Sequence, residues 1–215
     1  MNARPSGTDL RALHGLVFFA LLTITVQVPP LRVWPLLWVV PLTAYFAIVG
    51  ITPLLRATFA RWRFGRITPF AVSVAAIIAL CTVVTLIAFH RCSHPDVSSY
   101  RTMLPVRWFG GIVGTAIVFP LLNAALEEIV FRGLLFDSVG ALWGNMVAVA
   151  VSAAFFGSGH MQGYPSGALG AVLAGLFGLA TGWLRMTTGG IGLCWLVHIA
   201  ADATIFILLA RSQVW

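Results

Sequence analysis

The feature that most constrains this chain is a succession of apolar runs, each close to the roughly 20 residues that a helix needs to cross a bilayer. The runs are continuously apolar and lack the every-second-residue alternation of strands in a membrane barrel. Because a helix satisfies its own backbone hydrogen bonds in lipid, we expect an all-α fold with about seven transmembrane helices. The expected helices cover residues 13–28, 34–55, 69–89, 108–136, 141–156, 167–184 and 191–209.

The composition excludes a water-soluble fold, because 60% of the residues are hydrophobic and only 9% are charged. Soluble domains carry roughly 25% charged residues. The net charge of +7 comes from thirteen arginines against six acids. These arginines flank the apolar runs, as expected beside anionic lipid headgroups, and form no basic stripe with stacking aromatics. The expected surroundings are therefore a lipid bilayer, and no nucleic-acid partner is expected.

The ends of the apolar runs give a weak indication of topology. The run 13–28 follows two arginines like a signal sequence, but Pro29 and Pro30 stand where a cleavage site would be, so we expect a retained helix. Four arginines in the loop 56–66 favour a cytoplasmic N-terminus, whereas three between residues 91 and 107 oppose it. Three cysteines predict neither a disulfide framework nor a thiolate metal cluster.

The unusual polar residues lie in the second half of the chain. We therefore divide the chain into accessory transmembrane helices (1–107) and a four-helix catalytic core (108–215). Within the core, one run has small residues at four-residue spacing, which allows neighbouring backbones to approach closely. We expect this helix to be central to the bundle; its stripe is Gly170, Ala174, Gly178 and Gly182.

The only two glutamates of the chain, Glu127 and Glu128, are adjacent on the fourth run. Glu128 and Arg132 are four residues apart, which places them on one helical face as an ion pair. Glu127 points about 100 degrees away, with Asn123 one turn before it and no cation at helical spacing. An unpaired carboxyl group in apolar surroundings is costly and suits proton transfer, so Glu127 is a candidate catalytic residue.

Two further polar clusters lie on later runs. The fifth run ends in Phe156-Gly-Ser-Gly-His160, and on the last run His198 and Asp202 are one turn apart and face the same way. A single buried histidine is usually structural. Two on separate helices, with a spare carboxyl group on a third, indicate a shared site within the bilayer.

Other polar and aromatic residues receive simpler interpretations. Three histidines at run ends or in a loop, His14, His90 and His94, are expected to be solvated. Asp137 is expected to be a turn or cap residue. The tryptophans near run ends are expected to be interfacial anchors; they are Trp34, Trp38, Trp62 and Trp108.

The three clusters together resemble the CPBP intramembrane proteases, which include type II CAAX prenyl endopeptidases and bacteriocin-processing or immunity-associated membrane proteins. The family pattern is Glu-Glu-x-x-x-Arg, then Phe-x-x-x-His, then His-x-x-x-Asn or Asp. This chain shows the same order in Glu127-Glu128-x-x-x-Arg132, Phe156-x-x-x-His160 and His198-x-x-x-Asp202. The resemblance extends over about residues 118–209.

The resemblance implies a role for each motif residue. Glu127 and His160 would activate water, while His198 and its partner would stabilise the oxyanion. Glu128 and Arg132 would maintain the helix geometry. Prenyl-protein enzymes usually have asparagine where this chain has Asp202, and an aspartate donates a hydrogen bond only when protonated. Asp202 is therefore expected either to share in the oxyanion hole or to orient His198.

The expected activity is thus an intramembrane endopeptidase acting on a membrane-anchored protein or peptide. No cofactor is expected, and a zinc-dependent variant ranks second because the chain lacks His-Glu-x-x-His. Other readings are a non-catalytic immunity-type or scaffold protein and a proton pathway, although relays need polar residues throughout the membrane thickness. The absence of lysine beside abundant Arg, Ala and Gly favours a GC-rich bacterial genome, hence the inner membrane and a bacterial precursor as substrate.

Overall fold

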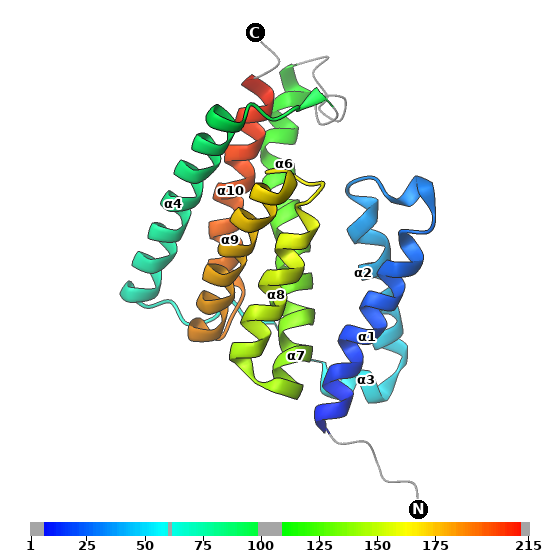
Figure 1. Ribbon diagram of the computed structural model, residues 1–215. Helices are drawn as coiled ribbons and strands as arrows, with labels where there is room; N and C mark the ends of the chain where they lie inside the picture. Colours follow the sequence, from blue (N-terminus) through cyan, green and yellow to red (C-terminus); the bar gives the residue numbers. More distant parts are fainter. Residues whose placement is uncertain (1–6, 60–61, 99–108, 212–215) are drawn as a thin grey trace, which may run out of the picture.

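The computed structural model describes residues 7–59, 62–98 and 109–211, and within these ranges the chain forms helices joined by turns and loops, with no strand (Figure 1). This confirms the expected all-α membrane fold. The elements, in chain order, are α1 (Gly7–Thr25), η1 (Pro29–Leu31), α2 (Leu36–Ile51), α3 (Pro53–Thr58), α4 (Pro69–Ser93), α6 (Phe109–Glu128), η2 (Ile129–Leu135), α7 (Phe136–Trp143), α8 (Asn145–Gly159), α9 (Gly167–Thr188) and α10 (Gly192–Arg211).

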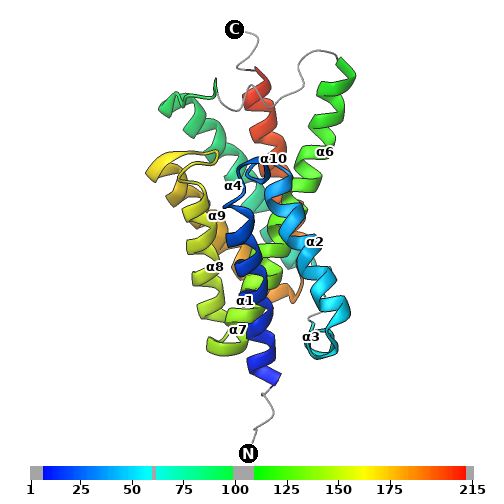
Figure 2. The same cartoon turned by 90° about the vertical axis from the view of Figure 1, so that its right-hand side faces the viewer.

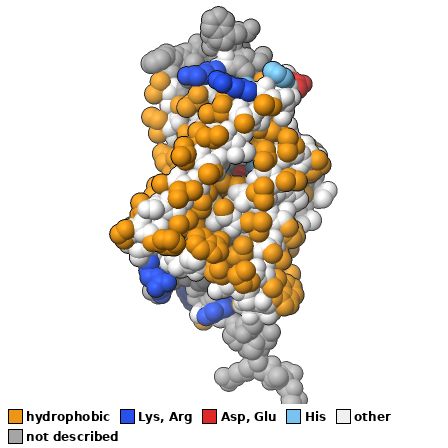
Figure 3. Space-filling view, turned by 60° about the vertical axis from the view of Figure 1, so that its left-hand side comes forward, with side chains coloured by type: hydrophobic (Ala, Val, Ile, Leu, Met, Phe, Trp, Pro, Cys, Tyr) orange, Lys and Arg blue, Asp and Glu red, His pale blue; other side chains and the backbone are white. Residues whose placement is uncertain are grey.

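Each of the seven expected runs is helical. Within the described ranges, four helical stretches are long and apolar enough to cross a membrane, namely Pro69–Ser93, Val113–Trp143, Gly167–Thr188 and Gly192–Arg211. Three shorter apolar helices accompany them, Leu10–Thr25, Leu36–Ile51 and Asn145–Gly159. Figure 3 shows hydrophobic side chains over most of the height of one face. The basic side chains, all of which are arginines, gather toward its two ends. The chain is a multi-pass membrane protein.

Two helix boundaries differ from the sequence-based prediction. The run 34–55 is interrupted at Thr52, which is extended (φ −102°, ψ 102°) because the following Pro53 disfavours helical backbone at the residue before it. The fourth run does not end near Phe136: it continues through the π-helical segment η2 into α7 and stops at Gly144. A positive φ of 84° at Gly144, which favours glycine, terminates the helix there.

The small-residue stripe lies where α9 packs against α8; the close approach was predicted, and the partner helix was not. All four of its members are buried. A Cβ atom added at Gly178 would lie 2.9 Å from Cα of Ala153, closer than real contacts allow. The two helices are thus in direct backbone contact, which fixes the depth of α8 relative to the centre of the bundle.

The helices of the accessory segment cover two sides of the remaining bundle (Figures 1 and 2). On one side α1 packs against α7 and is joined by α2 and α3. On the other side α4 packs against α10 and α9, so that α10 is held between α4 and α6. The backbone after α3 also pairs with the α9–α10 turn, where the Ile191 amide donates to the Arg63 carbonyl across 3.0 Å.

Candidate active site

The adjacent glutamates lie in the last turn of α6, directly before η2, and their side chains diverge. Glu128 is fully buried, and its Oε1 lies 3.2 Å from Nη1 of Arg132, as the four-residue spacing predicted. The Glu127 side chain keeps 14% of its surface exposed. π-helical segments often occur at functional sites because the extra residue per turn redirects side chains. Figure 3 shows an acidic side chain within the otherwise apolar lateral face.

His198 of α10 lies between the two glutamates. Its Nδ1 is 2.8 Å from Oε1 of Glu128, and its Nε2 is 3.6 Å from Oε2 of Glu127. A carboxylate oxygen only accepts, so Nδ1 carries the proton of this bond and Nε2 faces Glu127. Nε2 also lies 3.8 Å from Oδ1 of Asp202. The imidazole is therefore oriented by Glu128, and Asp202 does not hold Nδ1.

Asn123 connects the two carboxyl groups that face Nε2 of His198. Its Nδ2 donates to Oδ2 of Asp202 across 3.1 Å and to Oε1 of Glu127 across 3.3 Å. Asn123 is itself buried one helical turn before Glu127. In this arrangement Asp202 accepts a hydrogen bond, which is the opposite of what a direct oxyanion donor does.

Arg132 supports Glu128 and contacts the aromatic rings next to it. Its guanidinium group is fully buried, pairs with Glu128 and donates to the hydroxyl of Thr181 on α9. The guanidinium carbon also lies 4.6 Å from the ring centroid of Phe156 and 5.9 Å from that of Phe177. A buried cation needs such partners, because an unpaired one would be strongly destabilising.

His160 follows the last residue of α8, and its position depends on Phe156. Nδ1 of His160 donates to the Phe156 carbonyl oxygen across 2.9 Å, and the two rings are 4.8 Å apart. The Phe156 ring in turn lies 5.6 Å from that of His198. With its proton on Nδ1, neutral His160 has an unprotonated Nε2 that can accept a proton. Burial lowers the pKa of His160 from its ordinary value of 6.5, which keeps the ring neutral at neutral pH.

Comparison with known protein families gives one match. Residues 107–204 match the family model described as type II CAAX prenyl endopeptidase Rce1-like, which is somewhat under half of the chain. Residues 107–204 are an Rce1-like domain. No curated protein and no solved structure matches the chain significantly. The family resemblance inferred from the three motifs is thereby confirmed.

The Rce1-like domain brings together all seven residues singled out by the motifs. It also contains contacts that the motifs did not predict. Glu128 was expected to pair with Arg132 and to maintain the helix geometry, and it also contacts His198. Asn123 was noted one turn before Glu127, but its bond to Asp202 on another helix had no local signal. Thr181 and Phe177 of α9, which contact Arg132, were not predicted at all.

Two histidines outside the candidate active site are less solvated than the sequence predicted. His14 is buried, not solvated, because Nδ1 lies 2.8 Å from the Tyr45 hydroxyl and Nε2 lies 3.1 Å from that of Thr58. His90 is half-buried and lies 2.8 Å from the Tyr164 hydroxyl.

His94 is exposed, as expected. Asp137 is neither a turn nor a cap residue: it lies within α7 and accepts a hydrogen bond from Arg185 across 2.9 Å.

The tryptophans also differ among themselves. Trp34 does more than anchor the chain at an interface, since its Nε1 donates to Oδ1 of Asn123 across 3.0 Å. Trp38 packs against Phe131, and Trp62 contacts Gly133 so closely that no Cβ would fit there. Trp108 lies outside the described residues.

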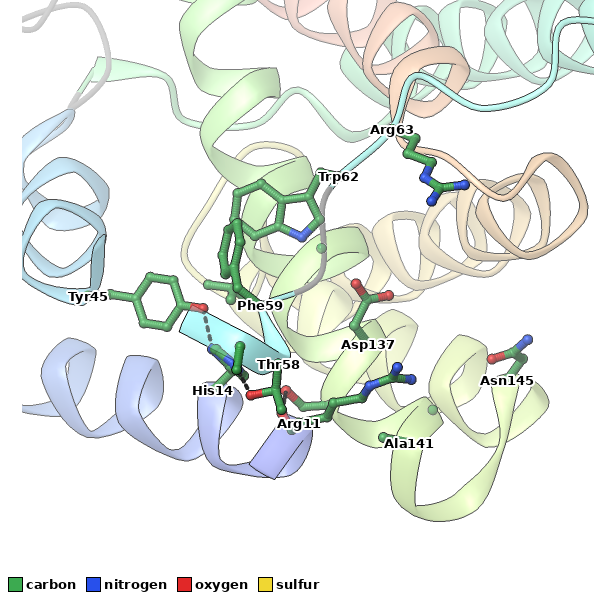
Figure 4. A pocket seen from close by; sticks show the side chains of 15 residues that line it. Arg11, His14, Tyr45, Thr58, Phe59, Trp62, Arg63, Asp137, Ala141 and Asn145 are labelled. Atoms are coloured by element: carbon green, nitrogen blue, oxygen red, sulfur yellow. Dashed lines mark hydrogen bonds between the residues drawn. The ribbon is translucent and has the colours of Figure 1, made fainter. Parts of the chain in front are cut away.

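A cavity of about 830 Å³ opens where α1, α3, α7 and the start of α8 meet (Figure 4). Arg11, His14, Asp137 and Asn145 are among its lining residues, and Figure 4 shows the His14 side chain between those of Tyr45 and Thr58. The residues that line it include none of the motif residues. The cavity is therefore separate from the candidate active site in the Rce1-like domain.

Two histidines and a glutamate, as found in this domain, can form a zinc site. Among the described residues, no group of three or more His, Cys, Asp or Glu side chains is arranged to hold a metal ion. The described cysteines are free, with Cys194 buried and Cys81 and Cys92 exposed.

Proposed function

We propose that this protein is an intramembrane endopeptidase that hydrolyses a membrane-associated protein or peptide precursor. The observation that carries the proposal is the convergence of Glu127, His198 and Asp202 from α6 and α10. The distances from His198 Nε2 to the two carboxyl groups are 3.6 and 3.8 Å. The family model matched by residues 107–204 is described as type II CAAX prenyl endopeptidase Rce1-like, which supports this reaction class.

The first step is activation of water. The Glu127 side chain is partly exposed and can bind a water molecule. Acting as a general base, Glu127 accepts a proton from this water as the water oxygen attacks the scissile carbonyl carbon. His160 supplies a second basic atom, since Nδ1 is occupied by the Phe156 carbonyl and Nε2 is not protonated. The proton taken from water then passes to the leaving amine, so that one water and one peptide bond become a carboxylic acid and an amine.

The second requirement is stabilisation of the developing oxyanion. Glu128 accepts a hydrogen bond from the Nδ1–H group of His198. The negative charge of this carboxylate favours an imidazolium ring with a second proton on Nε2. Such an Nε2–H group can donate to the carbonyl oxygen of a substrate that enters between the helices. Asp202 then accepts a hydrogen bond from Asn123, and its negative charge balances the positive charge of His198.

The substrate class follows from the position of the site. The cluster lies on helices that cross the membrane, so a substrate must be anchored in the bilayer or lie at its surface. A prenylated peptide ending in a CAAX sequence is the first probe, because the matched family is described by that substrate. A membrane precursor in the bacterial inner membrane is the preferred natural substrate, on the composition argument given above.

The decisive experiment compares the wild type with Glu127→Ala and His160→Ala. Each protein is purified in lipid nanodiscs and incubated with a fluorogenic farnesylated CAAX peptide, and membrane proteomes of the corresponding strains are searched for an accumulating precursor. Both variants should lose cleavage while remaining folded, and His94→Ala, which changes an exposed histidine, should keep it. Full turnover by either site variant would refute the mechanism. An inactive wild type with no accumulating precursor would favour a non-catalytic membrane protein.

A further inference from the structure

The accessory segment reaches the candidate active site through one side chain. Trp34 lies in the turn between η1 and α2, and its indole packs edge-on against Phe119 of α6 at a centroid distance of 5.3 Å. Its Nε1 donates to Oδ1 of Asn123 across 3.0 Å. Asn123 in turn contacts both carboxyl groups that face His198 Nε2.

This hydrogen bond determines which way the Asn123 amide is turned. An indole nitrogen only donates, so it must meet the amide oxygen, and Nδ2 is left facing the other way. Nδ2 has two hydrogens, and its neighbours on that side are Oε1 of Glu127 at 3.3 Å and Oδ2 of Asp202 at 3.1 Å. The opposite orientation would set the amide oxygen against two carboxyl oxygens and the amide hydrogens against the indole N–H.

We propose that Trp34 is a positioning residue of the active site, which fixes the amide of Asn123 and thereby holds the carboxyl groups of Glu127 and Asp202 together. Its catalytic meaning rests on the peptidase function proposed above. These four residues come from three separate parts of the chain, the η1–α2 turn, α6 and α10. The segment 1–107 thus contributes to the chemistry of the cluster as well as covering it.

The variant that tests this role is Trp34→Phe, which keeps an aromatic ring against Phe119 and removes the N–H donor. Trp195→Phe is the matched control. The Trp195 indole also donates to α6, across 3.1 Å, but to the backbone carbonyl of Leu121 and not to Asn123. Both variants therefore lose one indole hydrogen bond to α6, and only Trp34→Phe releases the Asn123 amide.

The first measurement needs no substrate. Infrared spectra of the proteins in nanodiscs are recorded, and the carboxyl bands of the cluster are assigned with Glu127→Gln and Asp202→Asn. Because hydrogen-bond donors shift carboxyl stretching bands, Trp34→Phe should shift the assigned bands as Asn123→Ala does, and Trp195→Phe should leave them in place. Unshifted bands in Trp34→Phe would overturn the proposal.

The second measurement is a double-mutant cycle in peptide turnover. Trp34→Phe should lower kcat about tenfold and Asn123→Ala about 100-fold, within the range found when supporting residues of a site are removed, with KM little changed. The double variant should be no slower than Asn123→Ala alone, because Trp34 acts through Asn123. Additive losses would overturn the proposal. If the wild type cleaves no probe and no precursor accumulates in the variant strains, the peptidase function fails and the infrared result alone decides the positioning role.

Discussion

Nδ1 of His198 donates to Oε1 of Glu128 across 2.8 Å, which ties the middle of α10 to the end of α6. Glu128 is also the ion-pair partner of Arg132. One fully buried carboxylate therefore serves both an imidazole and a guanidinium group. This makes Glu128 more than a helix-supporting residue, because it orients the histidine that faces Glu127.

The first prediction concerns the free energy of unfolding. Glu128→Gln keeps the shape of the side chain but leaves the fully buried Arg132 without its counter-ion. We expect a loss of about 3–5 kcal/mol, as when one partner of a buried pair is removed. The measurement is denaturant unfolding of the purified protein in detergent micelles.

Asp137→Asn is the matched control for this prediction. The Asp137–Arg185 pair keeps 24% and 13% of its side-chain surfaces exposed, so solvent screens it. Its loss should cost about 1 kcal/mol or less. Equal losses in the two variants would contradict the assignment of Arg132 as the buried cation that depends on Glu128.

A second prediction separates the two carboxyl groups that contact Asn123. Asp202→Asn retains an oxygen that can accept from Asn123, so kcat should stay within about tenfold, the scale of a single hydrogen bond. Glu127→Gln cannot accept a proton from water, and kcat should fall by about 10²–10⁴. Steady-state cleavage of the fluorogenic peptide tests both, and a dead Asp202→Asn beside an active Glu127→Gln would reverse the assigned roles.

The third prediction concerns pH. Burial, assisted by the nearby charges of His198 and Arg132, outweighs the bond to the Phe156 carbonyl and the charge of Asp202 and lowers the pKa of His160 below its ordinary 6.5. As pH falls from neutral, His160 should therefore stay neutral and able to accept a proton for longer than an unperturbed histidine. Histidine ¹⁵N NMR titration, with the signal assigned by its loss in His160→Gln, should place the midpoint below 6.5. A midpoint above that value would show that the ring is less buried or has a closer carboxylate partner.

The fourth prediction tests the contact between α8 and α9. Gly178→Ala places a Cβ 2.9 Å from Cα of Ala153, so the helices must move apart, at a cost of about 1–3 kcal/mol. Gly114→Ala is the control, because a Cβ there meets nothing within 4 Å and the change should be neutral or stabilising by up to about 1 kcal/mol. Thermal unfolding of both variants distinguishes the outcomes. A Gly178→Ala protein as stable as Gly114→Ala would mean that the two helices are not in backbone contact.

The fifth prediction separates the metal-free peptidase from the zinc-dependent alternative. Purified active protein should contain far less than one zinc per chain, and turnover should survive incubation with a strong chelator. Elemental analysis and a chelator titration provide the two readings. Stoichiometric zinc, together with activity lost to the chelator and restored by zinc, would establish the alternative instead.

Much of this protein follows from local sequence, because lipid permits few backbone structures. Long apolar runs must become helices, so the all-α fold and the seven helical runs could be predicted without coordinates. The Glu128–Arg132 pair was predictable for a similar reason, since both residues lie on one helix at a spacing that determines their geometry. The glycine stripe on α9 likewise indicated close packing, although not that α8 would be the partner.

The contacts between helices could be decided only by the tertiary structure. Whether His198 faces Glu128 or Asp202 depends on the rotation and depth of α10 against α6, and no spacing within either helix determines them. The same holds for Asn123 with Asp202 and, across 89 positions of the chain, for Trp34 with Asn123. Sequence supplied the ionisable groups and the helices that carry them; side-chain packing between helices selected which groups share a proton, a hydrogen bond or a charge.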